Sequence, residues 1–175
     1  MKAVIDTNVL LVANGQHDDV TPDCVEECIK CLLAMQKSGV TVIDDGFRIL
    51  GEYQHKTSLH PPKGSGDVFL KWLLRHCGTR YVEQVPLSEQ EENIFSEFPD
   101  AELQPSFDPP DRKFAAVAYA HPDKPEIWQA SDCKWLDWWP ALHVKGVRVK
   151  FLCPDDVCSA YRKKFPAKPP PQLPD

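Results

Sequence analysis

The chain has 175 residues, of which 42% are hydrophobic, and its formal net charge at pH 7 is −6. This length fits one domain that buries a core without disulfide or metal cross-links, and the negative charge argues against a general basic nucleic-acid coat protein. No apolar run approaches the roughly 18 residues of a membrane span, and the seven cysteines are too sparse for a small secreted scaffold. We therefore expect a soluble, cytoplasmic protein with no structural disulfides and no membrane partner.

Charge is distributed unevenly along the chain. Residues 143–175 contain seven Lys or Arg and three Asp, which gives +4 and leaves −10 for residues 1–142. An acidic metal-binding cleft beside a basic C-terminal flank would produce this division, and so would an ordinary solvated helix and tail.

The first predicted element is a short buried strand that contains Val4 and Ile5 and ends at Asp6, Thr7 and Asn8. A residue that leaves the carboxyl end of a central parallel strand points into the crevice where ligands bind. Asp6 is therefore the first candidate for chemistry. The alternative is that Asp6 caps the turn after the strand and that Asn8 forms the turn.

The next two elements predict a parallel sheet. Thr21 and Pro22 are an N-cap residue and a first-turn proline, so we expect a helix from Pro22 to about Lys37. The β-branched run at 40–43 is the second strand. A strand, a helix and a strand over this length indicate a right-handed βαβ unit.

The middle of the chain contains further predicted helices. One begins near Asp45 and carries Glu52, and another holds the apolar residues between 68 and 74. Residues 80–85 form a weak strand. A capping-box pattern then predicts a helix over 88–98.

The last third of the chain completes the predicted fold. The prolines after Asp108 start a helix with Asp111 in its first turn, and residues 126–129 form a strand that ends just before Ser131 and Asp132. The remaining elements are a short tryptophan-rich helix and turn, a strand over 147–152, a helix over 155–165 and an extended or disordered proline-rich tail over 166–175.

These elements predict one domain over residues 1–165, followed by the tail. The alternation of strands and helices indicates the α/β class. We expect a three-layer α/β/α sandwich around a central, mostly parallel sheet of four or five strands.

Four acidic residues fall at strand ends and helix starts that share one rim of this sheet: Asp6, Glu52, Asp111 and Asp132. Their side chains can meet there although they are far apart in the sequence. Clustered carboxylates repel one another and destabilise a fold unless a cation compensates them. Hard oxygen ligands with few His or Cys neighbours favour Mg²⁺ or Mn²⁺.

With these residues in this order, the chain resembles the PIN-domain nucleases. The resemblance rests on the opening motif at 4–10, on Glu52, on the pattern Asp-x-x-Phe-Ala-Ala-x-Ala from Asp111, and on Ser131 with Asp132. It spans most of the chain. It implies a parallel sheet of about five strands and an acidic site that cleaves RNA, or in some branches DNA, with Mg²⁺ or Mn²⁺.

The same resemblance implies roles for individual residues. The catalytic and metal-binding carboxylates would be Asp6, Glu52, Asp111 and Asp132. Thr7 or Asn8 would hold Asp6 in place, and Ser131 would bind a metal-bound water or a phosphate oxygen. The implied reaction is in-line attack of a metal-activated water on phosphorus, which leaves a 5′-phosphate and a 3′-hydroxyl.

The chain departs from the family pattern at one point. The family commonly has a second acidic residue soon after the one at Asp132, whereas here four residues intervene before Asp137. The resemblance alone also implies the partners: RNA is favoured over DNA, and a homodimer and an inhibitory antitoxin-like protein are further expectations.

Two other functions stay open. A haloacid-dehalogenase-type phosphohydrolase has an aspartate after its first strand and a later Asp-x4-Asp, which Asp132 and Asp137 match, but it requires a second aspartate where Asn8 stands. A catalytically silent PIN-like module would bind RNA or a protein instead of cleaving. The presence of all four candidate carboxylates argues against the silent module.

Two further patterns are better explained by packing. Cys24, Cys28 and Cys31 have a spacing used by iron–sulfur enzymes, but they fall at i, i+4 and i+7 of a predicted helix. We expect them to line one helix face as small apolar residues and not to bind a cluster or zinc. Trp135, Trp138 and Trp139 could stack on bases, but packing in the core or at a subunit interface is favoured.

Overall fold

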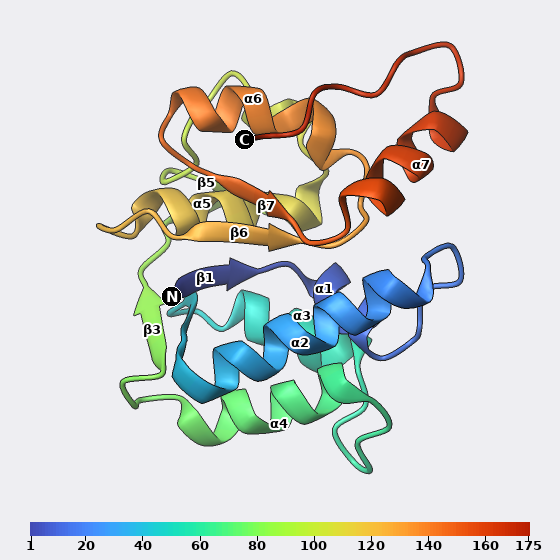
Figure 1. The fold of residues 1–175 in the computed structure, drawn as a ribbon. Helices are drawn as coiled ribbons and strands as arrows, with labels where there is room; N and C mark the ends of the chain where they lie inside the picture. The colour runs from blue at the N-terminus through green and yellow to red at the C-terminus, as the bar shows by residue number, and fades with distance from the viewer.

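Five short strands form one parallel sheet at the centre of the protein (Figure 1). The computed structural model describes all residues from Met1 to Asp175. Along the sheet the strands are β3 (Val82–Val85), β2 (Val40–Asp44), β1 (Lys2–Ile5), β6 (Glu126–Gln129) and β7 (Val149–Phe151). Every neighbouring pair is parallel, so the predicted α/β class and central sheet are confirmed.

The central strands are apolar because both faces of the sheet are covered. Ala3, Val4 and Ile5 of β1 are fully buried, as is Ile127 of β6. Strands that are buried on both faces read as continuous hydrophobic runs, which is the pattern of a parallel sheet between two helical layers.

Seven helices flank the sheet: α1 (Thr7–Ala13), α2 (Pro22–Ser38), α3 (Arg48–Lys56), α4 (Ser65–His76), α5 (Arg112–Ala120), α6 (Trp135–Val144) and α7 (Pro154–Lys164). In Figure 1, α2 and α4 lie together on one side of β1, and α5 and α6 lie on the other. The chain moves outward from β1 to β3 and then returns to β6, and crossovers of one hand then place the connecting helices on opposite faces of the sheet. The arrangement is a three-layer α/β/α sandwich.

The chain reverses its direction of travel across the sheet beside β1. β2 lies on one side of β1 and is reached through α2, whereas β6 lies on the other side and is reached much later. Ligands of open α/β sheets bind at the carboxyl ends of the strands at such a switch point. The topology therefore directs attention to the residues that follow β1 and β6.

A helix follows β1, where the sequence indicated only a turn at Asp6 and Asn8. Asp6 is the N-cap of α1, and its side chain accepts a hydrogen bond from the Asn8 N–H at 2.8 Å. Val9, Leu10 and Val12 bury the apolar face of this short helix. The turn-forming residues after β1 start a helix because the carboxylate satisfies one of its free N–H groups.

The predicted helix over 88–98 is wrong. β4 (Glu89–Glu91) and β5 (Ile94–Phe95) form an antiparallel hairpin in its place. Asn93 turns the chain with a φ of 57°, a left-handed conformation that asparagine tolerates better than most residues. The expected capping box paired Ser88 with Glu91, but the Ser88 N–H instead donates to the Glu97 carboxylate at 2.9 Å, across the ends of the hairpin.

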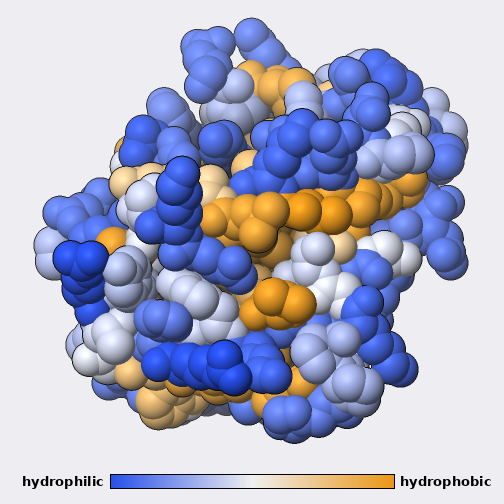
Figure 2. All heavy atoms as spheres, turned by 60° about the horizontal axis from the view of Figure 1, so that its bottom comes forward, coloured by the Kyte–Doolittle hydropathy of each residue, from blue (hydrophilic) through white to orange (hydrophobic).

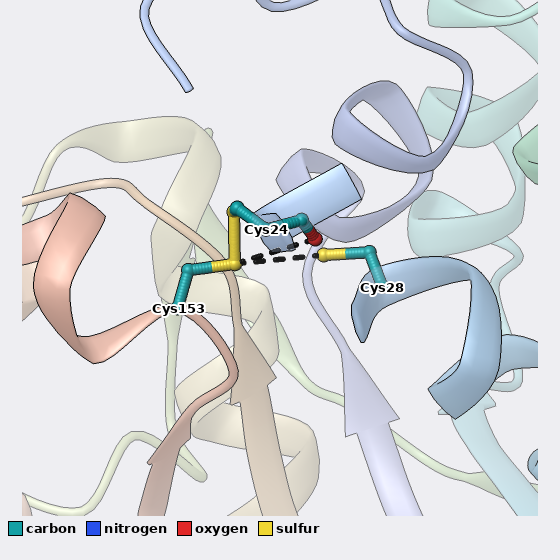
Figure 3. Close-up of side chains that lie close together, drawn as sticks. All are labelled: Cys24, Cys28 and Cys153. Atoms are coloured by element: carbon teal, nitrogen blue, oxygen red, sulfur yellow. Dashed lines mark hydrogen bonds between the residues drawn. A yellow bond between two sulfur atoms is a disulfide. The ribbon is translucent and has the colours of Figure 1, made fainter. Parts of the chain in front are cut away.

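The expectation of no structural disulfides is also wrong. Cys24 in α2 and Cys153 before α7 form a disulfide across a sequence separation of 129 (Figure 3). Cys28 lies beside this bond, with its Sγ 3.9 Å from the Sγ of Cys153, and it is fully buried as predicted. The disulfide joins the amino-terminal turn of α2 to the start of α7. A hydrogen bond from the Thr21 N–H to the Asp156 carboxylate links the same two segments.

Residues 166–175 adopt no helix or strand, but they contact the domain. The Trp139 indole N–H donates to the Gln172 carbonyl at 3.0 Å, and Leu173 packs against the hydrophobic core.

None of the helices combines the length and the apolar content that a membrane span requires.

The face that carries α2 and α4 has an apolar band across a mostly hydrophilic surface (Figure 2). Leu33 and Val68 are the large apolar side chains of these two helices that are more than a third exposed. The homodimer stays a prediction, because this face alone does not identify what would cover it.

Candidate active site

Asp6 lies at the switch point of the sheet, directly after β1. Its side chain is 4% exposed. Oδ1 accepts the Asn8 N–H, whereas Oδ2 is buried and has no hydrogen-bond partner. A buried carboxylate oxygen without a partner is costly, so this atom requires an explanation beyond helix capping.

Glu52 reaches the same place from α3. Its Oε1 accepts a hydrogen bond from the Thr7 hydroxyl at 2.5 Å, and its Oε2 accepts one from the Lys113 ammonium. Lys113 also donates to the Pro110 carbonyl and is 6% exposed. Glu52 is therefore tied both to α1 and to α5.

Sequence reasoning missed Lys113. The signal that could have found it is the pair of cationic residues, Arg112 and Lys113, directly before the apolar residues Phe114 to Ala118 of a buried helix. A lysine that folding buries needs an anionic partner, and Glu52 supplies that anion.

Asp111 and Asp132 complete the group. Asp111 is the last residue of a 3-10 turn, η2 (Pro109–Asp111), and immediately precedes α5, whereas a first-turn position inside the helix was predicted. Asp132 follows β6, and its Oδ1 accepts the Lys134 N–H at 3.1 Å. Asp132 lies three residues after the end of β6, and Asp111 ends the turn that leads into α5. The backbone therefore places both carboxylates at this edge of the sheet.

The pKa values show that the four carboxylates act on one another. Burial, followed by the negative charges of Asp111, Asp132 and Glu52, raises the pKa of Asp6 well above its ordinary value. Burial, followed by Asp132 and Glu52, raises the pKa of Asp111 to about 7, although Lys113 opposes the shift. The four side chains therefore lie near enough for their charges to affect one another, and their role as one metal site stays a prediction.

The pKa of Asp132 is raised by burial and held down in part by its surroundings. The Lys134 N–H, the Lys164 ammonium and His17 all favour the ionised carboxylate. Lys164 belongs to the last turn of α7, so this helix contributes positive charge to the rim of the site.

The four carboxylates have the donor chemistry of a site for a hard divalent cation, but they are not closed around one point. The one group of three His, Cys, Asp or Glu side chains whose ligand atoms lie within 4.8 Å of one another is Cys24, Cys28 and Cys153. Glu52 is the one carboxylate of the four that forms an ion pair, with Lys113, so no ion pair compensates the other three when they ionise. All donors are carboxylate oxygens, and Asp6 offers a buried oxygen that nothing in the protein satisfies. Mg²⁺ and Mn²⁺ prefer such ligands.

Hydrogen bonds fix the loop that follows β6. Asn8 contacts Asp6 through its backbone, while its side-chain oxygen accepts the Ser131 N–H at 2.9 Å. The Gln129 side-chain oxygen accepts the Ala130 N–H at 3.0 Å. Ser131 is 4% exposed, and its hydroxyl has no partner. Gln129 was not predicted, because an amide inside a buried strand carries no distinctive spacing.

Asp137 is not part of the group. It lies in α6, and its Oδ1 accepts a hydrogen bond from the Tyr161 hydroxyl at 2.8 Å. Its charge is not among those that shift the pKa of Asp6, Asp111 or Asp132. The bond to Tyr161 indicates a structural role, because it joins α6 to α7.

An open cleft of about 430 Å³ is lined by Asp132, the one carboxylate of the four that borders it. Asn8, Ser131 and Asp132 form one side, and His17 and Lys164 are among the other lining residues. A larger cavity of about 600 Å³ lies beside the C-terminal tail, and none of the four carboxylates lines it. Of these two hollows, only the smaller one borders a candidate carboxylate, Asp132.

Comparisons of the chain with protein-family models, with curated proteins and with solved structures find no match.

Proposed function

We propose that the protein is a metal-dependent nuclease of the PIN-like type, with RNA favoured over DNA as its substrate. The observation that carries this proposal is the buried, unpartnered Oδ2 of Asp6 inside a cluster of four carboxylates. Folding alone gives no reason to bury four carboxyl groups together, because they repel one another once they ionise.

The residues that would hold Mg²⁺ or Mn²⁺ are Asp6, Glu52, Asp111 and Asp132. A divalent ion bound there supplies a Lewis acid for a phosphoryl oxygen and lowers the pKa of a bound water. The raised pKa values of Asp6 and Asp111 predict that binding releases protons, because the ligands must be ionised.

The protein's own side chains would orient this site. Lys113 and Thr7 hold the two oxygens of Glu52, so that carboxylate cannot rotate freely. Asn8 fixes the loop that carries Ser131, whose free hydroxyl is available to donate to a phosphate oxygen. In the proposed hydrolysis, the water oxygen bonds to phosphorus, the bond from phosphorus to the 3′ oxygen breaks, and that oxygen gains a proton.

The surroundings of Asn8 disfavour the phosphohydrolase alternative. Haloacid-dehalogenase chemistry requires a carboxylate at this position, and an amide cannot exchange a proton in its place. The Asn8 side-chain oxygen instead accepts the Ser131 N–H. This contact gives the residue a structural task that is consistent with a nuclease site.

The test is cleavage of end-labelled single-stranded RNA and of matched single-stranded DNA with Mn²⁺ or Mg²⁺, with a chelator as the negative control. We expect metal-dependent cutting that is lost in Asp6→Asn and kept in Asp137→Asn, which removes an acidic side chain outside the group. Asparagine is itself a good N-cap, so Asp6→Asn should fold. Intact substrates together with no calorimetric signal for metal binding would refute the proposed site.

A further inference from the structure

Basic residues of α7 line the same cleft as Asn8, Ser131 and Asp132. The last turn of α7 contains Arg162, Lys163 and Lys164. Of these residues, Lys163 and Lys164 line the cleft. A strand whose scissile phosphate lies at the carboxylates would therefore pass close to these ammonium groups.

The ammonium groups of Lys163 and Lys164 have no carboxylate partner, although the Lys164 ammonium lies 5.8 Å from the centre of the Phe165 ring. Neither Lys163 nor Lys164 forms an ion pair, although Lys2, Lys30, Lys113 and Lys134 do. Lys163 also borders a second hollow that contains Asp19, Asp155 and Asp156, so its charge is partly offset. Lys164 does not border that hollow, and it is the stronger candidate to bind an anion.

Two hydrogen-bonding groups in the same cleft lack partners. The Ser131 hydroxyl is buried in a residue that is 4% exposed, and the Nδ1 atom of His17 is also buried without a hydrogen bond. Both residues line the cleft together with Lys164. Buried polar groups normally have hydrogen-bond partners. Two such groups without partners, beside an ammonium without an ion pair, therefore indicate a ligand with several acceptor oxygens.

We propose that this cleft is a phosphate-binding subsite that holds a backbone phosphate of a single-stranded nucleic acid next to the scissile one. Lys164 is the principal contact, Lys163 adds charge, and Ser131 and His17 donate hydrogen bonds. The inference rests on the proposed nuclease function and specifies how the same site positions its substrate. Asp19 and Asp132 also line the cleft and oppose an anion there, so a cation held by Asp132 would favour binding.

The matched variants are Lys164→Gln and Lys37→Gln. Both replace an exposed lysine that has no ion-pair partner, so they change the net charge equally. Lys37 lies in the last turn of α2, which leads into the amino end of β2, whereas the cleft lies at the carboxyl ends of the strands. Each variant is made with Asp6 intact, for cleavage assays, and together with Asp6→Asn, so that binding is measured without cleavage.

The first measurement is the fluorescence anisotropy of a labelled single-stranded RNA with the Asp6→Asn chains across a salt series. Loss of one phosphate contact lowers the slope of log affinity against log salt by about 0.7 for a single strand, which corresponds to roughly fivefold weaker binding at 0.1 M salt. We expect this loss for Lys164→Gln, little change for Lys37→Gln, and recovery in Lys164→Arg. In cleavage assays of the protein with Asp6 intact, Lys164→Gln should raise KM and leave kcat nearly constant.

The outcomes separate this inference from the proposed function. If the wild-type chain cleaves RNA while Lys164→Gln matches Lys37→Gln in affinity, salt slope and KM, the subsite is wrong and the nuclease stands. If no nucleic acid is cleaved but RNA binding still depends on Lys164, the subsite stands and the nuclease proposal fails.

Discussion

Replacement of Asp111 by asparagine should stabilise the metal-free protein, even though Asp111 belongs to the proposed active site. Burial and the charges of Asp132 and Glu52 raise the pKa of Asp111 from 3.8 to about 7. Between these two values, the folded state keeps a proton that the unfolded chain has released. Stability therefore falls as the pH rises through this window, and the loss is complete above pH 7.

The size of the effect follows from the same two numbers. A difference of 7 − 3.8, or about 3 pH units, corresponds to at most about 4 kcal/mol in the free energy of unfolding at pH 8. Asparagine resembles the protonated carboxyl group in size and carries no charge. The variant should therefore match the wild type near pH 4 and exceed it by up to about 4 kcal/mol at pH 8.

The assay is urea unfolding of both proteins with a chelator at pH 4, 6 and 8. Asp123→Asn is the control, because Lys2 lowers the pKa of that exposed carboxylate and its loss should destabilise the protein slightly at neutral pH. Addition of Mn²⁺ should stabilise the wild type more than Asp111→Asn. An Asp111→Asn variant that is no more stable than the wild type at pH 8 would show that the carboxylates do not repel one another as the structure indicates.

Three further substitutions test individual contacts. Lys113→Met should destabilise the protein by roughly 2–3 kcal/mol in urea unfolding, less than for a fully buried pair because the side chain of Glu52 is 21% exposed; an unchanged midpoint would contradict the pairing. Cys153→Ser opens a cross-link over 129 residues and should cost about 2–5 kcal/mol without reductant, a difference from the wild type that should vanish in reductant. Gly66→Ala would place a Cβ 2.2 Å from the Leu10 carbonyl oxygen and should lower stability by about 1–3 kcal/mol, so an unaltered melting temperature would show that α4 shifts freely against α1.

Much of the fold could be predicted because its signals are local. The apolar run at Val4 and Ile5 and the capped start of α2 at Thr21 both lie where the structure has them. Parallel topology then brings strand ends to one rim, so the meeting of Asp6 with Asp132 followed from chain order. The nuclease activity, the metal, the RNA substrate and the cytoplasmic setting stay predictions.

Other features depend on contacts that the sequence does not display. The spacing of Cys24 within α2 indicates a helix face, but nothing local indicates that Cys153 lies opposite it. The capping-box pattern at Ser88 fits a helix until Asn93 turns left-handed and the hairpin forms. The role of Lys113 depends on its ion pair with Glu52, which is 61 residues away in the sequence.

The two explanations of Asp6 that the sequence left open are compatible, because a carboxylate has two oxygens. Oδ1 accepts the Asn8 N–H and caps α1, whereas Oδ2 is buried and unpartnered among the other carboxylates. Asparagine would cap the helix as well and would avoid burying a charge. Asp6→Asn therefore separates the roles: it should keep or raise the stability of the metal-free protein, and it should abolish metal-dependent cleavage. A variant that lost stability and kept activity would assign Asp6 to capping alone.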